Sequence, residues 1–197
     1  MDILKFVLAA VAGYLIGSAN ISILVSRGMG GDVRQKGSGN AGATNMARVY
    51  GLGVGLLTMA LDMVKAVLAM LLGRYLLGDW GLMASGGACI VGHCFPVFHH
   101  FKGGKGISVG GMIAMLIDWR VGVAVFAAFG LGAALTRKVS FGSICGAVAI
   151  ILASLLFHVS TPRLILAALS MAVALYQHRG NMKRLADGTE PDFKPKQ

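Results

Sequence analysis

The sequence predicts an all-α integral membrane protein, a bundle of seven transmembrane helices that forms a single domain over residues 1–197. Of its residues, 56% are hydrophobic and only 13% are charged, whereas an average soluble domain carries about 25% charged residues. Apolar stretches recur along the whole chain, several of them near the ~20 residues that a helix needs to cross a bilayer. The 29 glycines include GxxxG pairs inside these stretches, which favour close packing of membrane helices.

The apolar stretches predict where each helix lies. The first one continues through "ISILV", past the length of a signal-peptide core, and is therefore expected to be a retained helix rather than a cleaved signal. The shorter stretches need protein neighbours or a thinned bilayer to span. The seven expected helices cover residues 4–26, 51–73, 80–98, 107–118, 121–136, 139–158 and 162–177.

Residues 107–136 could form one long helix or two short ones separated at "DWR". Two helices place thirteen Lys and Arg residues on one side of the membrane and four on the other. A single helix places seven and nine on the two sides and leaves Asp118 and Arg120 in lipid, at a cost of several kcal/mol. Because positive charge concentrates on the cytoplasmic side, we expect seven spans, an outside N-terminus and a cytoplasmic C-terminus.

The net charge of +10 does not indicate nucleic-acid binding, because the charges lie in short loops beside membrane helices. These charges indicate the topology of the helices in the membrane, and they can also attract anionic lipids. Within the spans, Asp62 and Lys65 are three residues apart and can neutralise each other on one helix face. Three cysteines without CxxC spacing, also within spans, are expected to be small buried hydrophobes: Cys89, Cys94 and Cys145.

Three polar, basic segments fall on the predicted cytoplasmic side, and the outer connections contain nothing comparable. They read "GSGNAGATNMAR" at 37–48, "GHCFPVFHHFKGGKG" at 92–106 and "HRGNMKRLADGTE" at 178–190. The first matches GxGxxG, but no buried strand precedes it, so a dinucleotide fold is excluded. Its glycines, amides and hydroxyls can instead converge on an anion.

The second segment ends like a phosphate-binding P-loop, but His99 replaces the first glycine and Gly106 replaces the Ser or Thr. This excludes a nucleotide site and leaves Lys105 as a mobile ammonium beside exposed amides, a suitable phosphate contact. No cluster of His, Cys and carboxylates has metal-ligand spacing, so no metal or cofactor is expected.

The three segments resemble the three motifs of the bacterial acyl-phosphate-dependent glycerol-3-phosphate acyltransferase family, in the same order and over essentially the whole chain. Ala41 stands where the family often has Val. The resemblance implies transfer of a fatty acyl group from acyl phosphate to the sn-1 hydroxyl of glycerol 3-phosphate, giving lysophosphatidic acid and phosphate in the first step of phospholipid synthesis. It implies a multi-pass protein of the bacterial cytoplasmic membrane with a cytoplasmic site. A soluble enzyme that forms acyl phosphate is the candidate protein partner.

The family motifs also imply the site residues. The expected catalytic residues are Ser38, Asn45, Arg48, Lys105 and His178. The expected substrate-binding residues are Gly39, Asn40, Gly42, Thr44, Gly103, Gly104 and Asn181. Ser38 and the asparagines of the first motif would bind acyl phosphate or the developing oxyanion, Arg48 and Lys105 would clamp phosphates, and His178 and Asn181 would orient the acceptor.

A mixed anhydride already carries a good leaving group, so positioning and charge neutralisation can supply most of the acceleration. Three groups are candidates for the base: His178, His93 and a phosphate oxygen of the donor, whose second pKa near 6 is suitable. No His is followed five positions later by Asp, so the HxxxxD pair of other acyltransferases is absent. The alternative function is a small-anion transporter with the glycine-rich loops as a gate.

Overall fold

The computed structural model describes residues 2–194 and 196, which form helices and loops with no strand. Two short 3-10 turns, Val33–Gln35 and Val97–His99, lie in the connections. The α-helices are α1 (Ile3–Ser18), α2 (Ile21–Gly28), α3 (Ala43–Tyr50), α4 (Leu52–Cys94), α5 (Ile107–Ile117), α6 (Trp119–Thr136), α7 (Val139–Leu156), α8 (Thr161–Gln177) and α9 (Arg179–Ala186).

The prediction of one continuous helix over 4–26 is wrong, because the chain leaves helical geometry at Ala19. Asn20 then caps α2, with its Oδ1 accepting from the Ile23 N–H at 3.1 Å. The ammonium of Lys65 donates to the carbonyl oxygens of Gly17 at 3.1 Å and Ala19 at 3.0 Å. A cation bonded to the carbonyls that a helix end leaves free stabilises the break.

Helix α4 consists of two arms that fold back on each other. Leu77 and Gly78 have non-helical geometry, and the φ of +57° at Gly78 is one that favours glycine. A Cβ on Gly73 would lie 2.2 Å from the carbonyl oxygen of Gly81, so the arms meet backbone to backbone. The predicted helices 51–73 and 80–98 are these two arms, although the second ends at Cys94.

The break expected between α5 and α6 is confirmed. Asp118 has an extended backbone (φ −163°, ψ 134°) and caps α6 by accepting from the Arg120 N–H at 2.8 Å. Its carboxylate also pairs with the Arg120 guanidinium at 2.8 Å. Helix α6 therefore begins at Trp119, two residues earlier than predicted.

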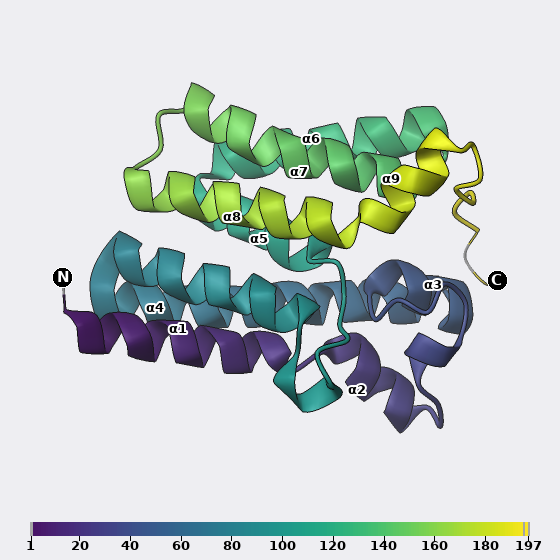
Figure 1. Cartoon of the computed structure of the whole chain (residues 1–197), viewed down its shortest axis with the longest axis horizontal. Helices are drawn as coiled ribbons and strands as arrows, with labels where there is room; N and C mark the ends of the chain where they lie inside the picture. Colours follow the sequence, from purple (N-terminus) through teal and green to yellow (C-terminus); the bar gives the residue numbers. More distant parts are fainter. Residues whose placement is uncertain (1, 195, 197) are drawn as a thin grey trace.

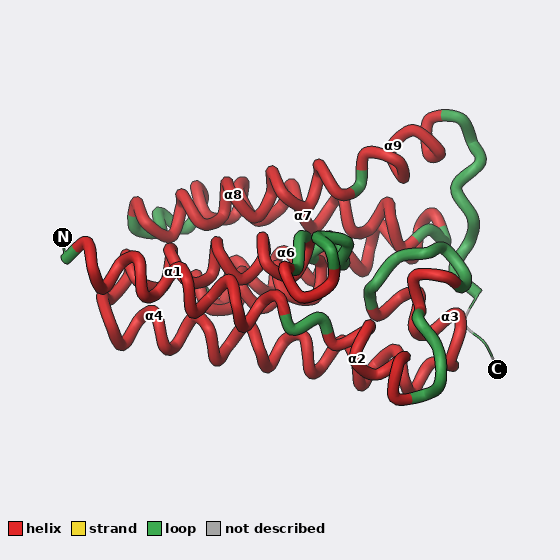
Figure 2. Tube along the Cα trace, turned by 60° about the horizontal axis from the view of Figure 1, so that its bottom comes forward, coloured by secondary structure: helices red, strands yellow, loops and turns green. Residues whose placement is uncertain are grey.

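The helices pack side by side, with α1 and the two arms of α4 on one side and α6, α7 and α8 on the other (Figure 1). Apolar residues such as Met70, Ile90, Ile113 and Leu166 fill the space between them and are less than 1% exposed. The N-terminus lies at one end of the bundle, while α9, α3 and the C-terminal residues lie at the other (Figures 1 and 2).

Contacts at the end of the bundle near the N-terminus join connections far apart in sequence. Arg163 pairs with Asp79 at 2.9 Å and donates to the carbonyl oxygen of Ile117 at 2.8 Å. By length and composition, the helical stretches 3–28, 52–99, 119–136 and 139–156 could each cross a membrane, and α5 and α8 are shorter apolar helices. The three polar motifs lie together at the opposite end.

Candidate active site

A cavity of about 510 Å³ opens at the end of the bundle where the three motifs meet. It brings together ten of the twelve predicted site residues: Ser38, Gly39, Asn40, Gly42, Thr44, Asn45, Arg48, Lys105, His178 and Asn181. Further wall residues that the sequence did not single out come from α7, α8, α9 and the C-terminal segment: Ser140, Gln177, Arg179, Arg184, Glu190 and Phe193. Gly103 and Gly104 are not among the residues that line it.

The first loop is organised by Asn45, which is 1% exposed. Its Nδ2 lies 3.1, 3.0 and 3.0 Å from the carbonyl oxygens of Val33, Lys36 and Asn40, respectively. Its Oδ1 accepts from the Ser38 N–H at 2.9 Å. The amide is therefore occupied by the loop itself, and the geometry favours a positioning role over the direct substrate contact that we expected.

The N-terminal end of α3 faces the cavity. Gly42 is the N-cap residue and provides no side-chain cap, and it lines the cavity together with Ala43 and Thr44. The N–H groups in the first turn of a helix lack intrahelical acceptors, and the helix dipole favours negative charge there. With the Thr44 and Ser38 side chains beside it, this end of α3 suits a phosphate.

Lys105 belongs to a chain of polar contacts that the sequence did not predict. Its ammonium donates to Asn181 Oδ1. Asn181 Nδ2 donates to Glu190 Oε1 at 2.7 Å, and Glu190 Oε2 accepts from Arg184 Nε at 2.7 Å. Glu190 thus holds two groups of the cavity wall, Asn181 and Arg184, a role that a carboxylate within a basic motif could have suggested.

The electrostatics of the cavity leave cations available to a ligand. Burial, followed by the nearby Arg184 and Arg48 charges, lowers the pKa of Lys105 from 10.5 to about 8. Burial acts to raise the pKa of Glu190, but hydrogen bonds from Asn181 and Arg184 outweigh it and the pKa is lowered. Arg48 forms no ion pair or side-chain hydrogen bond with any residue that the structure describes, so its guanidinium is free to bind an anion.

His178 presents one defined ring nitrogen to the cavity. Its Nδ1 lies 2.8 Å from the carbonyl oxygen of Ala174, which can only accept, so Nδ1 carries the proton and donates. Nε2 is then an acceptor. Burial, and next the Lys105 charge, lower the pKa of His178 from 6.5 to about 4, despite the opposing hydrogen bond to Ala174. The ring is therefore neutral at pH 7.

Gly103 and Gly104 attach the second loop to the end of α4. Their N–H groups donate to the carbonyl oxygens of Cys94 at 3.2 Å and His93 at 3.1 Å. A Cβ on Gly103 would lie 2.1 Å from the His93 carbonyl oxygen, and one on Gly104 would lie 2.2 Å from His93 Nε2. This placement indicates a packing role, and direct substrate contact by either glycine stays a prediction.

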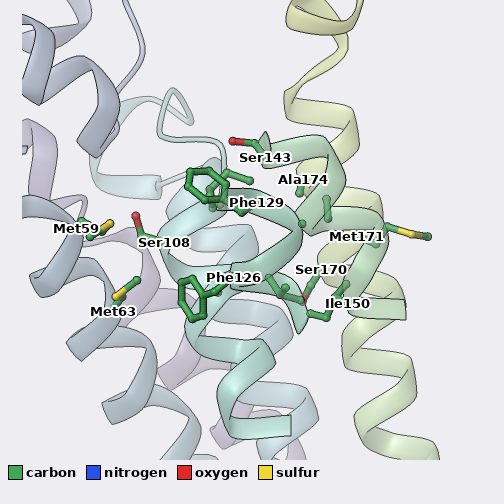
Figure 3. A pocket seen from close by; sticks show the side chains of 17 residues that line it. Met59, Met63, Ser108, Phe126, Phe129, Ser143, Ile150, Ser170, Met171 and Ala174 are labelled. Carbon is green, nitrogen blue, oxygen red and sulfur yellow. The ribbon is translucent and has the colours of Figure 1, made fainter. Parts of the chain in front are cut away.

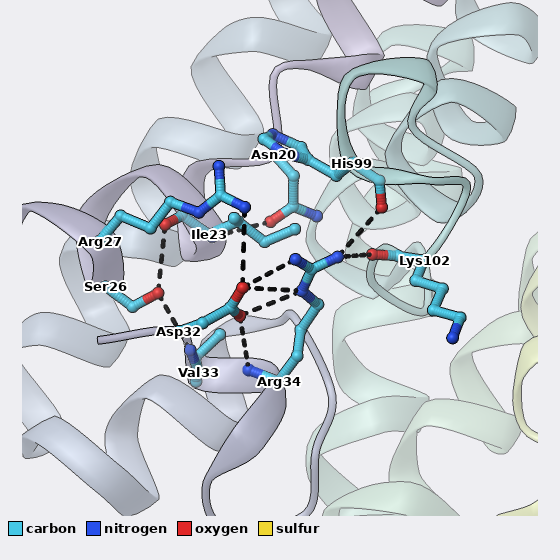
Figure 4. A network of polar contacts seen from close by, with 9 residues as sticks. All are labelled: Asn20, Ile23, Ser26, Arg27, Asp32, Val33, Arg34, His99 and Lys102. Carbon is cyan, nitrogen blue, oxygen red and sulfur yellow. Dashed lines mark hydrogen bonds and ion pairs between the residues drawn. The ribbon is translucent and has the colours of Figure 1, made fainter.

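Arg34 joins the second loop to the first from outside the cavity (Figure 4). Its guanidinium pairs with Asp32 through Nε–Oδ1 at 3.0 Å and Nη2–Oδ2 at 2.7 Å. The same group donates from Nη1 to the carbonyl oxygens of His99 at 3.0 Å and Lys102 at 3.4 Å. Lys102 contributes only this carbonyl and leaves its ammonium in solvent.

An apolar slot of about 80 Å³ adjoins the cavity. Figure 3 shows Phe126, Phe129, Ile150 and Met171 around it, with Met59 at the opposite wall. Both spaces share part of their lining, namely Met59, Ile107, Ser108, Phe129 and Ser143. Among the described residues, no group of three His, Cys, Asp or Glu side chains could hold a metal ion.

The fold and the site define a membrane protein of apolar helices with a cavity lined by cations and polar groups beside an apolar slot. Residues 7–188 match the family model "Glycerol-3-phosphate acyltransferase". The chain is similar to the glycerol-3-phosphate acyltransferases of Thermoanaerobacter sp. (strain X514), with 41% identity over 93% of each chain, and of Rubrobacter xylanophilus, with 39% identity over 95% of this chain and 94% of the other.

Two crystal structures of the integral membrane glycerol 3-phosphate acyltransferase PlsY share the fold. The glycerol 3-phosphate form superposes with a TM-score of 0.91 at 31% identity and covers 96% of both chains. The lysophosphatidic acid form gives 0.89 at 30% identity and covers 96% of this chain and 95% of the other. The chain therefore belongs to the glycerol-3-phosphate acyltransferase family and is an integral membrane acyltransferase of phospholipid synthesis. The family resemblance of its three motifs is confirmed.

Proposed function

We propose that the chain transfers a fatty acyl group from acyl phosphate to the sn-1 hydroxyl of glycerol 3-phosphate. The acceptor oxygen forms an ester bond to the acyl carbon, the carbon–oxygen bond of the mixed anhydride breaks, and phosphate leaves. The observation that carries the proposal is the shared wall between the cationic cavity and the apolar slot. A donor with a phosphate at one end and an acyl chain at the other can place its reacting carbonyl at this junction.

Different residues of the cavity wall can bind each of the two substrates. The N-terminal end of α3, Ser38 and Arg48 face one part of the cavity and provide donors and charge for one phosphate. Lys105, held by Asn181, adds a cation, and the acceptor nitrogen of His178 can bind a hydroxyl of glycerol 3-phosphate. The part of the acyl chain next to the carbonyl lies in the slot among Met59, Phe126 and Phe129.

For the proton, the donor phosphate is a better acceptor than His178. Nε2 of His178 is free to accept, but a group with a pKa of about 4 is a weaker base than a phosphate with a second pKa near 6. The donor phosphate is also delivered beside the reacting carbonyl in every productive complex. His178 then orients the hydroxyl while the departing phosphate takes the proton.

For the placement in the membrane, we propose seven spans formed by α1, the two arms of α4, α5, α6, α7 and α8. The positive-inside distribution supports an outside N-terminus and a cytoplasmic C-terminus in a bacterial inner membrane. The three motif loops would then meet in the cytoplasm, where a soluble enzyme that forms acyl phosphate can deliver its product.

The test is an assay with purified protein in proteoliposomes, acyl phosphate and labelled glycerol 3-phosphate. We expect labelled lysophosphatidic acid from acyl phosphate and none from acyl coenzyme A, because none of the described segments outside the helices is large enough to cradle coenzyme A. Efficient turnover with acyl coenzyme A would overturn the donor assignment. Uptake of label without covalent change would instead identify a transporter.

A further inference from the structure

A buried group of three ionisable side chains lies beneath the two glycine-rich loops, and the proposed mechanism does not use it. Lys65 Nζ lies 2.8 Å from Asp62 Oδ1 and 3.1 Å from His93 Nδ1. The expected pair of Asp62 and Lys65 is therefore present, and His93 from the other arm of α4 completes it. His93 Nδ1 lies 3.5 Å from Asp62 Oδ1, too far for a good hydrogen bond.

The contacts of Lys65 assign the tautomer of His93. An ammonium has three N–H groups and no acceptor. Those of Lys65 are shared among four neighbours: the carbonyl oxygens of Gly17 and Ala19, Asp62 Oδ1 at 2.8 Å and His93 Nδ1 at 3.1 Å. Because an ammonium cannot accept, the 3.1 Å contact is a hydrogen bond only if Nδ1 accepts, which places the ring proton of neutral His93 on Nε2. The Asp62 carboxylate, 2.8 Å from the ammonium, helps to hold Lys65 in this position.

The Nε2–H group of His93 is directed at the substrate cavity. His93 lines the cavity, and its Nε2 has no hydrogen-bond partner among the described residues. The ring as a whole is only 3% exposed. Nε2 itself is not fully enclosed by protein atoms, whereas Nδ1 of His99 is enclosed and has no hydrogen-bond partner. A Cβ on Gly104 would meet both this nitrogen and the Ala41 carbonyl oxygen, at 2.2 and 2.8 Å. The donor thus lies at the seam between the first and second loops.

We propose that His93 is a catalytic residue that acts as a neutral hydrogen-bond donor, through Nε2–H, to an anionic oxygen of the bound acyl donor. This inference rests on the proposed function, because it takes acyl phosphate as the occupant of the cavity. A nitrogen that already carries the proton cannot accept the hydroxyl proton, so His93 is not the base. The oxygen is either a phosphate oxygen or the oxyanion that develops from the carbonyl, and both accept from a fixed donor.

The first test is nitrogen NMR of the full chain with ¹⁵N-labelled histidine in nanodiscs. The resonances of His93 are those that disappear in His93→Gln. We expect a neutral ring with a protonated Nε2 and a bare Nδ1 at pH 7. A non-hydrolysable acyl phosphonate should shift the Nε2 resonance more than the Nδ1 resonance. A protonated Nδ1, or an Nε2 resonance that ignores the phosphonate, would overturn the proposal.

The second test compares two replacements of similar size. In His93→Gln the amide N–H₂ can reach the place of Nε2–H, whereas His93→Leu has no donor. Loss of a hydrogen bond to a charged group should lower kcat/KM of His93→Leu by about ten- to hundredfold, with His93→Gln much less affected. A higher KM for acyl phosphate indicates the phosphate oxygen, and a lower kcat at unchanged KM indicates the oxyanion.

If His93 had only a structural role, the amide donor of His93→Gln would not restore activity. Equal losses of kcat/KM in the two variants would therefore contradict the proposal. Thermal unfolding of both variants checks the fold, and the NMR experiment on the unmodified chain decides the matter if His93→Leu does not fold. A failure of the proposed function would look different, because the unmodified protein would then form no lysophosphatidic acid. A failure of the proposal for His93 leaves that activity intact.

Discussion

The ammonium of Lys105 donates a hydrogen bond to the side-chain oxygen of Asn181, although 76 residues separate the two in sequence. Asn181 in turn donates to Glu190, which is 7% exposed. One contact thus joins the second motif to the third and holds a cation at the wall of the cavity. Because the amide of Asn181 is occupied on both sides, the geometry favours a role in positioning Lys105, and we expect His178 to orient the acceptor.

Removal of either Arg48 or Lys105 should weaken phosphate binding strongly. Arg48→Ala and Lys105→Ala each lose a charge-assisted contact, at roughly 1.5–3 kcal/mol, which is about ten- to hundredfold in kcat/KM. Lys102→Ala is the matched control, because its ammonium is exposed and only its carbonyl is used. Steady-state kinetics with both substrates measures the effect, and similar mild losses in all three variants would show that these charges serve topology alone.

The pKa of Lys105 predicts an alkaline limit to activity. Burial and neighbouring arginines lower this pKa to about 8, so the side chain is charged below that pH and loses its charge as the pH rises through it. We therefore expect kcat/KM, which reports the free enzyme, to fall above about pH 8. In Lys105→Arg the guanidinium stays charged, and the alkaline limb should disappear or move upward. An unchanged limb in this variant would assign it to another group.

His178→Asn should separate acceptor binding from proton transfer. We expect a higher KM for glycerol 3-phosphate and slower turnover, because the acceptor nitrogen is lost. An ionisation near pH 6 should persist, since it belongs to the substrate phosphate; His178, with a pKa of about 4, is already neutral there. A variant with normal acceptor affinity and a flat pH profile would identify His178 as the base.

Gly104→Ala should disturb the seam between the loops. The new Cβ would lie 2.2 Å from His93 Nε2, a nitrogen on a ring that Lys65 holds in place. Overpacking of this kind costs about 1–3 kcal/mol, and we expect a lower unfolding temperature together with a raised KM. Gly53→Ala is the control, because a Cβ there meets nothing within 4 Å. Equal unfolding temperatures and KM values for the two variants would mean that the second loop shifts at little cost to make room for the new methyl group.

Much of the helix pattern was predictable from hydrophobicity. The two arms of α4 and helices α5 to α8 lie close to the predicted ranges, and the break at Asp118 followed from the cost of leaving a charged pair in lipid. The first helix was mispredicted because Asn20 is a single polar residue in an apolar run. The ammonium of Lys65, from another helix, stabilises the carbonyls that the break exposes, and the sequence around Asn20 gives no sign of this contact.

The motifs likewise indicated which residues gather at the cavity but not what each side chain does there. Glycines, amides and cations in three short segments are enough to predict an anion site, since these groups bind phosphate in any arrangement that lets them converge. Whether an amide faces the ligand or its own loop depends on distances between segments. Asn45 faces its own loop, Glu190 secures Asn181 and Arg184, and His93 meets Lys65 across 28 residues. Composition and spacing therefore determined the class of protein and the chemistry of its ligand, whereas tertiary packing decided which groups remain free to bind it.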